Sequence, residues 1–109
     1  MKYMMFVATD AEPDASAEKP GEIERWLEET ADRRITGERL RPARDAKTVR
    51  VRGGKVIITD GPFTETKEVI VGFDILECDS IEGAIAIAAK HPMARAGRLE
   101  LRPFWPFEE

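Results

Sequence analysis

The sequence predicts an α+β fold, a ferredoxin-like βαββαβ sandwich with helices over one face of an antiparallel sheet. Three observations support this class. The 109 residues suit a single domain over residues 1–109 with one core. Strand and helix patterns follow in the order strand, helix, strand, strand, helix, strand. A hairpin signal with a Gly-Gly turn lies near the middle of the chain.

The first elements are a strand and a long helix. Tyr3–Ala8 is apolar without alternation, which is typical of a central strand covered on both faces. A polar loop follows over residues 9–21. The spacing of apolar residues then predicts a helix over Glu22–Thr36, with Gly37 as its stop. Its inward residues are Ile23, Trp26, Leu27, Thr30, Ala31 and Ile35.

The hairpin is the clearest local signal. Leu40–Lys47 is irregular or a short strand, and two strands around Gly53-Gly54 follow it. The two-residue turn pairs Arg52 with Lys55 and Val51 with Val56. This register places four branched apolar residues on one face of the hairpin: Val49, Val51, Val56 and Ile58.

The second half predicts a strand, a helix and a strand. Glu68–Cys78 reads as a long strand, and Asp79-Ser80 offers an N-cap for the next helix. That helix ends at His91-Pro92. Its buried stripe comprises Ile81, Ala84, Ile85 and Ala88, with Ile87 on a flank. The last strand, Arg98–Arg102, alternates, with Leu99 and Leu101 inward.

The central strands predict a homodimer. Tyr3–Ala8 and Val69–Leu76 are apolar at both odd and even positions, so the sheet face without helices also needs a cover. A second subunit that lays its sheet against this one would supply the cover. The aromatic tail from Phe104 to Phe107 could lie across that partner.

Composition and charge argue against several classes of protein. The net charge of −4 and the pI near 5.1 argue against a nucleic-acid binder. No apolar run approaches the ~20 residues that span a bilayer, and the N-terminus lacks a signal pattern, so we expect a cytoplasmic protein away from membranes. Cys78 is the single cysteine, which excludes an intrachain disulfide and favours a buried, inert thiol. No cofactor or metal site is expected.

The turn after the hairpin carries a family resemblance. Asp60-Gly61-Pro62-Phe63, then Glu65-Thr66-Lys67-Glu68 and Gly72-Phe73, stand at the spacing of the YCII-related family, and the chain resembles its DGPF branch in particular. The resemblance runs from Lys2 to Pro103. It implies a dimeric α/β-barrel with a cleft between sheet and helices in each subunit.

Six residues are candidates for a site. Asp60 could act as an acid or base, or its carboxylate could accept N–H bonds from the turn. Phe63 could border a ligand or fill the core, and Lys67 could hold an anionic substrate or lie in a solvated loop. Tyr3 and Trp26 could line the cleft or simply pack.

His91 is the sixth candidate and the only histidine. It could work as a catalytic group with Asp60, or its cation could cap the helix C-terminus. Some relatives in the broader YCII group are thought to use a His–Asp pair with the histidine on the first helix. The first helix here has none, so that pair is not carried over.

Three functions remain open at this point. The first is small-molecule binding in a cleft beside the Asp60–Phe63 corner, with or without acid–base catalysis. The second is a non-catalytic regulatory or interaction module, such as a partner of an extracytoplasmic-function sigma factor, because genes for DGPF-type relatives often lie beside those for such factors. The third is a structural dimer in which the motif only shapes the fold.

Overall fold

A computed structural model describes residues 1–14, 16, 19–62 and 68–106. The strands are β1 (Lys2–Thr9), β2 (Arg34–Arg39), β3 (Lys47–Arg52), β4 (Lys55–Asp60), β5 (Ile70–Glu77) and β6 (Gly97–Pro103). The helices are α1 (Glu22–Glu29), α2 (Ile81–Ala89) and α3 (Met93–Ala96), with a 3-10 turn, η1, over Ala43–Asp45.

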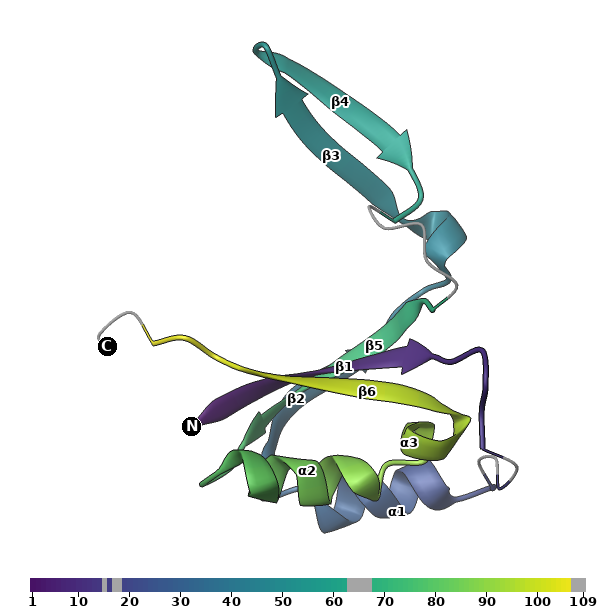
Figure 1. Ribbon diagram of the computed structural model, residues 1–109, viewed down its shortest axis with the longest axis vertical. Helices are drawn as coiled ribbons and strands as arrows, with labels where there is room; N and C mark the ends of the chain where they lie inside the picture. Colours follow the sequence, from purple (N-terminus) through teal and green to yellow (C-terminus); the bar gives the residue numbers. More distant parts are fainter. Residues whose placement is uncertain (15, 17–18, 63–67, 107–109) are drawn as a thin grey trace.

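The main sheet confirms the predicted fold class. Its four antiparallel strands lie in the order β2-β5-β1-β6. Without the hairpin, the elements β1, α1, β2, β5, α2 and β6 give the βαββαβ order of a ferredoxin-like fold. All three α-helices cover one face of this sheet, and among the described residues the other face is bare of α-helices (Figure 1). We call the bare side the outer face.

The predicted first helix is wrong beyond its eighth residue. α1 ends at Glu29, and Arg34–Arg39 is an edge strand instead of the end of a helix. The Thr30 hydroxyl and its N–H both bond to the Trp26 carbonyl, which closes the last turn. In β2 the main chain pairs with β5 in place of bonding within a helix, so the tertiary partner overrides the periodic pattern that included Ile35.

α2 begins and ends near its predicted bounds. The Ser80 side chain accepts a hydrogen bond from the Gly83 N–H at 3.2 Å, as an N-cap does. Ala84 and Ala88 are buried as predicted. Ile85 is 53% exposed, so its predicted place in the buried stripe is wrong, and Ile87 packs on the core instead.

The core lies between the sheet and the helices. Alternate residues of β1 point into it, and on β5 Leu76 pairs with Tyr3 and faces the same way. Leu99 and Leu101 of β6 pack on this core as predicted. The buried hydrophobic members are Tyr3, Met5, Val7, Trp26, Leu76, Cys78, Ala84 and Ala88.

The hairpin forms in its predicted register but stands apart from the main sheet. β3 and β4 pair Arg52 with Lys55 and Val51 with Val56, and they make a separate two-stranded sheet. Both turn glycines, Gly53 and Gly54, have positive φ (57° and 76°), as this tight turn requires. The hairpin projects away from the body (Figure 1). We call residues 47–60 the arm.

Candidate functional site

A cleft of about 620 Å³ lies between the helices and the β2–β5 edge of the sheet. Backbone and side chains from β1, β2, β5, α1 and the segment after α2 line it. The cleft brings together an ionisable group from the sheet, Asp74, one from the sheet edge, Arg34, and His91 from the helical layer. Its aromatic wall is Trp26. We call this space the sheet–helix cleft.

An ion pair holds the floor of the sheet–helix cleft. Arg34 Nε donates to Asp74 Oδ1 at 2.6 Å. The Asp74 side chain is 8% exposed and that of Arg34 is 26% exposed. Burial raises the pKa of Asp74, because the lost hydration outweighs the attraction of the Arg34 guanidinium. A buried carboxylate with a raised pKa is typical of a functional site.

The β2 backbone passes close to this ion pair at Gly37. A methyl group at Gly37 would lie 2.1 Å from Asp74 Oδ1 and 2.6 Å from the Arg34 guanidinium. Both distances are far inside van der Waals contact. Only glycine lets the edge strand run beside the buried Asp74 carboxylate, so the residue type at position 37 fixes the geometry of the pair.

His91 lies buried in the same cleft as a neutral imidazole. It is 6% exposed, and its Nδ1 accepts the Met93 N–H at 2.9 Å. Burial, aided by the positive charge of Arg34, lowers the pKa of His91 to about 4. The lowered pKa disfavours the alternative of a cationic helix cap. With Nδ1 as acceptor, the neutral ring carries its hydrogen on Nε2.

Trp26 is both a wall of the cleft and a core residue. It is 2% exposed, and its indole N–H donates to the Ile87 carbonyl at 2.9 Å. Its ring meets the His91 imidazole edge-on, with centroids 4.6 Å apart. Tyr3 is 3% exposed and belongs to the core, and it lines neither of the two cavities described here.

The Asp60–Phe63 corner lies at the base of the arm. The Asp60 side chain is 82% exposed and forms an ion pair with Lys47 of the facing strand. The Gly61 N–H bonds to the Ala46 carbonyl at 2.8 Å, and the Thr48 hydroxyl donates to the Gly61 carbonyl. The structure does not bring Asp60 to His91, because Asp60 ends the arm and His91 lies beneath the sheet.

Two predicted ligand-binding residues, Phe63 and Lys67, lie outside the described residues. Their roles stay predictions. So do the catalytic roles of Asp60 and His91.

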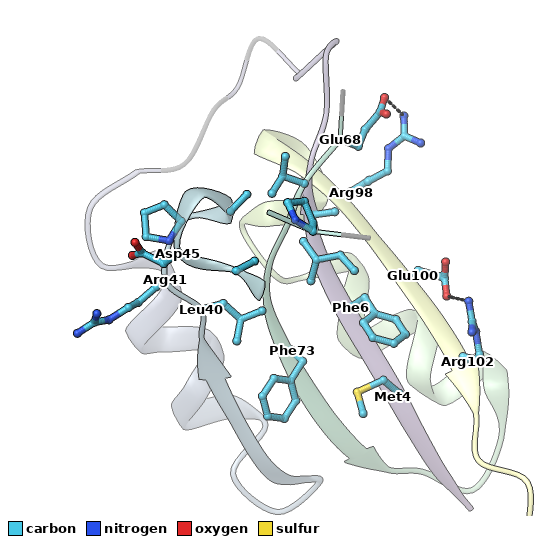
Figure 2. Close-up of a pocket in the computed structure, with 17 residues that line it drawn as sticks. Met4, Phe6, Leu40, Arg41, Asp45, Glu68, Phe73, Arg98, Glu100 and Arg102 are labelled. Carbon is cyan, nitrogen blue, oxygen red and sulfur yellow. Dashed lines mark hydrogen bonds and ion pairs between the residues drawn. The ribbon is translucent and has the colours of Figure 1, made fainter. Parts of the chain in front are cut away.

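A larger cavity, of about 1010 Å³, lies on the outer face of the sheet. Figure 2 shows Met4, Phe6 and Phe73 on its floor and Leu40 beside them. The segment around η1 and Pro62 of the corner form its far wall. Arg98 of β6 pairs with Glu68, which precedes β5, and Arg102 pairs with Glu100 of its own strand (Figure 2). The cavity that borders the corner is therefore this outer one, and the buried ionisable groups lie in the other.

Sequence reasoning missed Arg34 and Asp74. Asp74 carried a usable signal, because it is the only charged residue between Ile70 and Leu76, and a charge inside a buried strand needs a partner. Arg34 carried none, because the helical pattern placed it at the exposed end of a helix. Only the pairing of β2 with β5 places Arg34 beside Asp74.

The described residues contain neither a metal-binding cluster nor a membrane-spanning helix. Within the described residues, no three His, Cys, Asp or Glu side chains are grouped so that they could hold a metal ion. Among those same residues, no helix has both the length and the apolar character needed to cross a membrane.

Comparison with known proteins places the chain in a family. The profile of the YCII-related domain matches residues 1–108. An uncharacterized protein of Rhizobium meliloti (strain 1021) is 40% identical over 67 residues, which is 60% of this chain. The matched segment spans about half of that relative, 54% of its length. The chain belongs to the YCII-related family.

Proposed function

We propose that this protein binds a small molecule in the sheet–helix cleft and supports acid–base chemistry there. One observation carries the proposal: a buried carboxylate, Asp74, shares a cleft with a neutral buried histidine, His91, and an arginine, Arg34. Groups with shifted pKa values that converge in a concave space are the usual mark of a binding or catalytic site.

The three side chains have distinct roles in this proposal. Within the described residues, the hydrogen bond from Arg34 reaches Oδ1 of Asp74, which leaves Oδ2 to take up or release a proton. His91 presents its Nε2 hydrogen as a donor to the ligand, because its Nδ1 is engaged by the Met93 N–H. Arg34, one-quarter exposed, is positioned to attract an anionic group.

The lining favours a small aromatic or apolar metabolite with one polar or anionic group. Ile23, Leu27 and Val71 supply apolar walls around the ionisable groups. A space of about 620 Å³ holds a ligand of metabolite size.

Thermal unfolding against a panel of small carboxylates and aromatic metabolites tests the proposal. A ligand at about 100 times its Kd adds ~2.7 kcal/mol to the free energy of unfolding, which raises Tm by several degrees in a domain of this size. We expect at least one compound to stabilise the wild type and to lose its effect in Asp74→Asn, which keeps the shape of the side chain.

Asp60→Asn is the matched control, because it makes the same chemical change on the exposed arm. A compound that stabilises Asp60→Asn but not Asp74→Asn supports the sheet–helix cleft. The reverse pattern would move the site to the predicted corner beside the outer cavity. Silence across the panel would contradict ligand binding of this class.

A second proposal is a non-catalytic interaction module, with an extracytoplasmic-function sigma factor as a partner. The observation in its favour is exposed apolar surface outside both cavities. Trp105 is 85% exposed and Phe104 is 38% exposed on the chain after β6. Co-purification of such a factor with the wild type, and its loss in Trp105→Ala, is the result expected of this role.

The assembly and the location are also proposals. We infer a homodimer, because the outer face leaves Phe6 and Phe73 of two central strands uncovered by helices. We place the protein in the cytoplasm on the single, buried Cys78. Membership of the DGPF branch rests on Asp60-Gly61-Pro62-Phe63, and the division into one domain rests on chain length.

A further inference from the structure

We propose that two copies of this chain exchange arms, so that the arm of each copy lies over the outer-face cavity of the other. This inference rests on the homodimer proposed above and goes beyond it. It names the segment that makes the contact and the surface that receives it.

The arm has an apolar face that is largely exposed in the part of the chain that the structure describes. Val49, Val51, Val56 and Ile58 share that face, and they are 61%, 57%, 64% and 65% exposed. These four branched apolar side chains are adjacent and each is more than half exposed, so they form a contiguous apolar patch, unlike single exposed apolar residues. An isolated two-stranded hairpin is marginally stable in water, so this one requires a further contact.

The extended shape of the chain also indicates that the arm requires a contact outside its own chain. The radius of gyration over Cα atoms is 16.1 Å, whereas a compact domain of this length has about 13 Å. The projecting arm extends the molecule (Figure 1). A chain that is extended by an ordered, apolar arm is typical of one that completes its fold on a partner.

The outer-face cavity offers a surface of matching character. Its floor is apolar, with Met4, Phe6 and Phe73 partly exposed and Leu40 45% exposed (Figure 2). The two strands of the arm have six residues each, about 20 Å in length, comparable to the strands that form the floor. Sheet faces that pack on each other need such aligned, apolar surfaces.

Charge favours a second copy of this chain as the occupant. The arm has four basic residues and one acidic residue, a net charge of +3. The whole chain has a net charge of −4, so the remainder carries −7. Among the described residues Arg50, Arg52 and Lys55 form no ion pair, and they point their charge away from the apolar face. The attraction acts at long range between the basic arm and the acidic body as a whole, because the cavity itself is lined by equal numbers of basic and acidic residues: Arg41, Arg98, Arg102, Asp45, Glu68 and Glu100.

Exchange of arms also closes the assembly. Each copy carries both an arm and a receiving face, so one two-fold axis satisfies both contacts and leaves no open end. The partner's arm would roof the cavity, whose space of about 1010 Å³ is open in the single chain. At the base of the arm the Gly61 N–H bonds to the Ala46 carbonyl, so the two strands leave the body side by side.

Sedimentation equilibrium of matched variants tests the arm. Ile58→Thr and Ile57→Thr make the same change at neighbouring positions on opposite faces of β4. Threonine keeps the β-branched shape, so the hairpin is retained. We expect Ile58→Thr to raise the dimer Kd by about 10-fold or more, since the change occurs twice in a two-fold dimer, and Ile57→Thr to leave it unchanged.

Photo-crosslinking identifies the receiving surface. A benzophenone amino acid is placed at Val51, and equal amounts of copies labelled with light and with heavy nitrogen are mixed. We expect crosslinks from the arm to peptides that contain Phe6 or Phe73, with half of the products carrying mixed labels, as random pairing between copies requires.

Each other outcome overturns the inference in a recognisable way. A monomeric wild type would remove both the dimer and the arm exchange. A dimer with the same Kd in Ile58→Thr as in the wild type would keep the dimer and reject the arm. Crosslinks without mixed labels would show that the arm folds onto its own body.

Discussion

At the scale of single residues, the site depends on groups whose protonation the fold has changed. His91 is neutral because burial and Arg34 oppose its cation, and Asp74 holds its proton more tightly because burial opposes its anion. The two pKa values therefore move toward each other, one down to about 4 and one upward from 3.8. The two shifts have opposite effects on the pH dependence of stability.

Stability should fall as the pH falls through the range set by His91. The unfolded chain binds a proton near pH 6.5, whereas the folded chain binds it only near pH 4, so the unfolded state takes up more protons between these values. The loss approaches about 3 kcal/mol at the lower limit. Urea unfolding between these pH values measures it.

His91→Asn is the control for that pH dependence, because its amide oxygen can still accept the Met93 N–H. We expect the variant to lack the decline between the two pKa values. What remains would include the opposite contribution of Asp74, whose protonated form favours folding and is lost as the pH rises above 3.8. An unchanged decline in His91→Asn would contradict the neutral, buried imidazole.

Gly37→Ala should disturb the Arg34–Asp74 ion pair although it replaces neither of these two residues. The added methyl group would overlap the Asp74 carboxylate, so the edge strand or the pair must move. We expect a loss of about 2 kcal/mol or more in the free energy of unfolding.

Gly83→Ala is the matched comparison for Gly37→Ala. It lies in α2, where the nearest atom to a new Cβ is Ser80 Oγ at 3.6 Å. Alanine there should add about 0.5–1 kcal/mol through helix propensity. Similar effects of the two alanines on denaturant unfolding would show that the contact at Gly37 is unimportant.

At the scale of elements, caps and partners decide where segments end. α1 ends where the Thr30 hydroxyl donates to the Trp26 carbonyl. β2 forms because its main chain pairs with β5. α2 starts where Ser80 accepts the Gly83 N–H. The arm differs from these elements because its strands pair only with each other in the main-chain hydrogen bonds described.

Loss of the α2 cap should be measurable. Ser80→Ala removes the acceptor for the Gly83 N–H, which leaves one more unpaired N–H at the helix N-terminus. We expect a cost of about 1 kcal/mol in chemical unfolding, and recovery of most of it in Ser80→Asp. Equal stability of Ser80→Ala and Ser80→Asp would contradict a role for the side chain as a cap.

At the scale of the whole molecule, stability and assembly should be coupled. If copies exchange arms, a higher protein concentration favours the folded dimer over the unfolded chain by mass action. Tm should therefore rise with protein concentration. Differential scanning calorimetry at several concentrations measures this shift. We expect Ile58→Thr to weaken the concentration dependence and Ile57→Thr to retain it. A Tm independent of concentration in the wild type would argue against a stable dimer.

The sequence by itself determined what depends on neighbours along the chain. The turn Gly53-Gly54 and the alternation around it set the hairpin register, and Ser80 set the start of α2. Two apolar central strands and two helical patterns were enough for the α+β class, because periodicity reports which faces are buried.

The tertiary structure decided what depends on distant partners. Arg34 became a strand residue because β5 lay beside it, and only that pairing brought its guanidinium to Asp74, 40 positions away. Burial lowers the pKa of His91 and favours its neutral form, although a place at a helix C-terminus by itself favours a cation. Hydrogen-bond pairing and desolvation depend on which atoms meet in space, and local patterns do not carry that information.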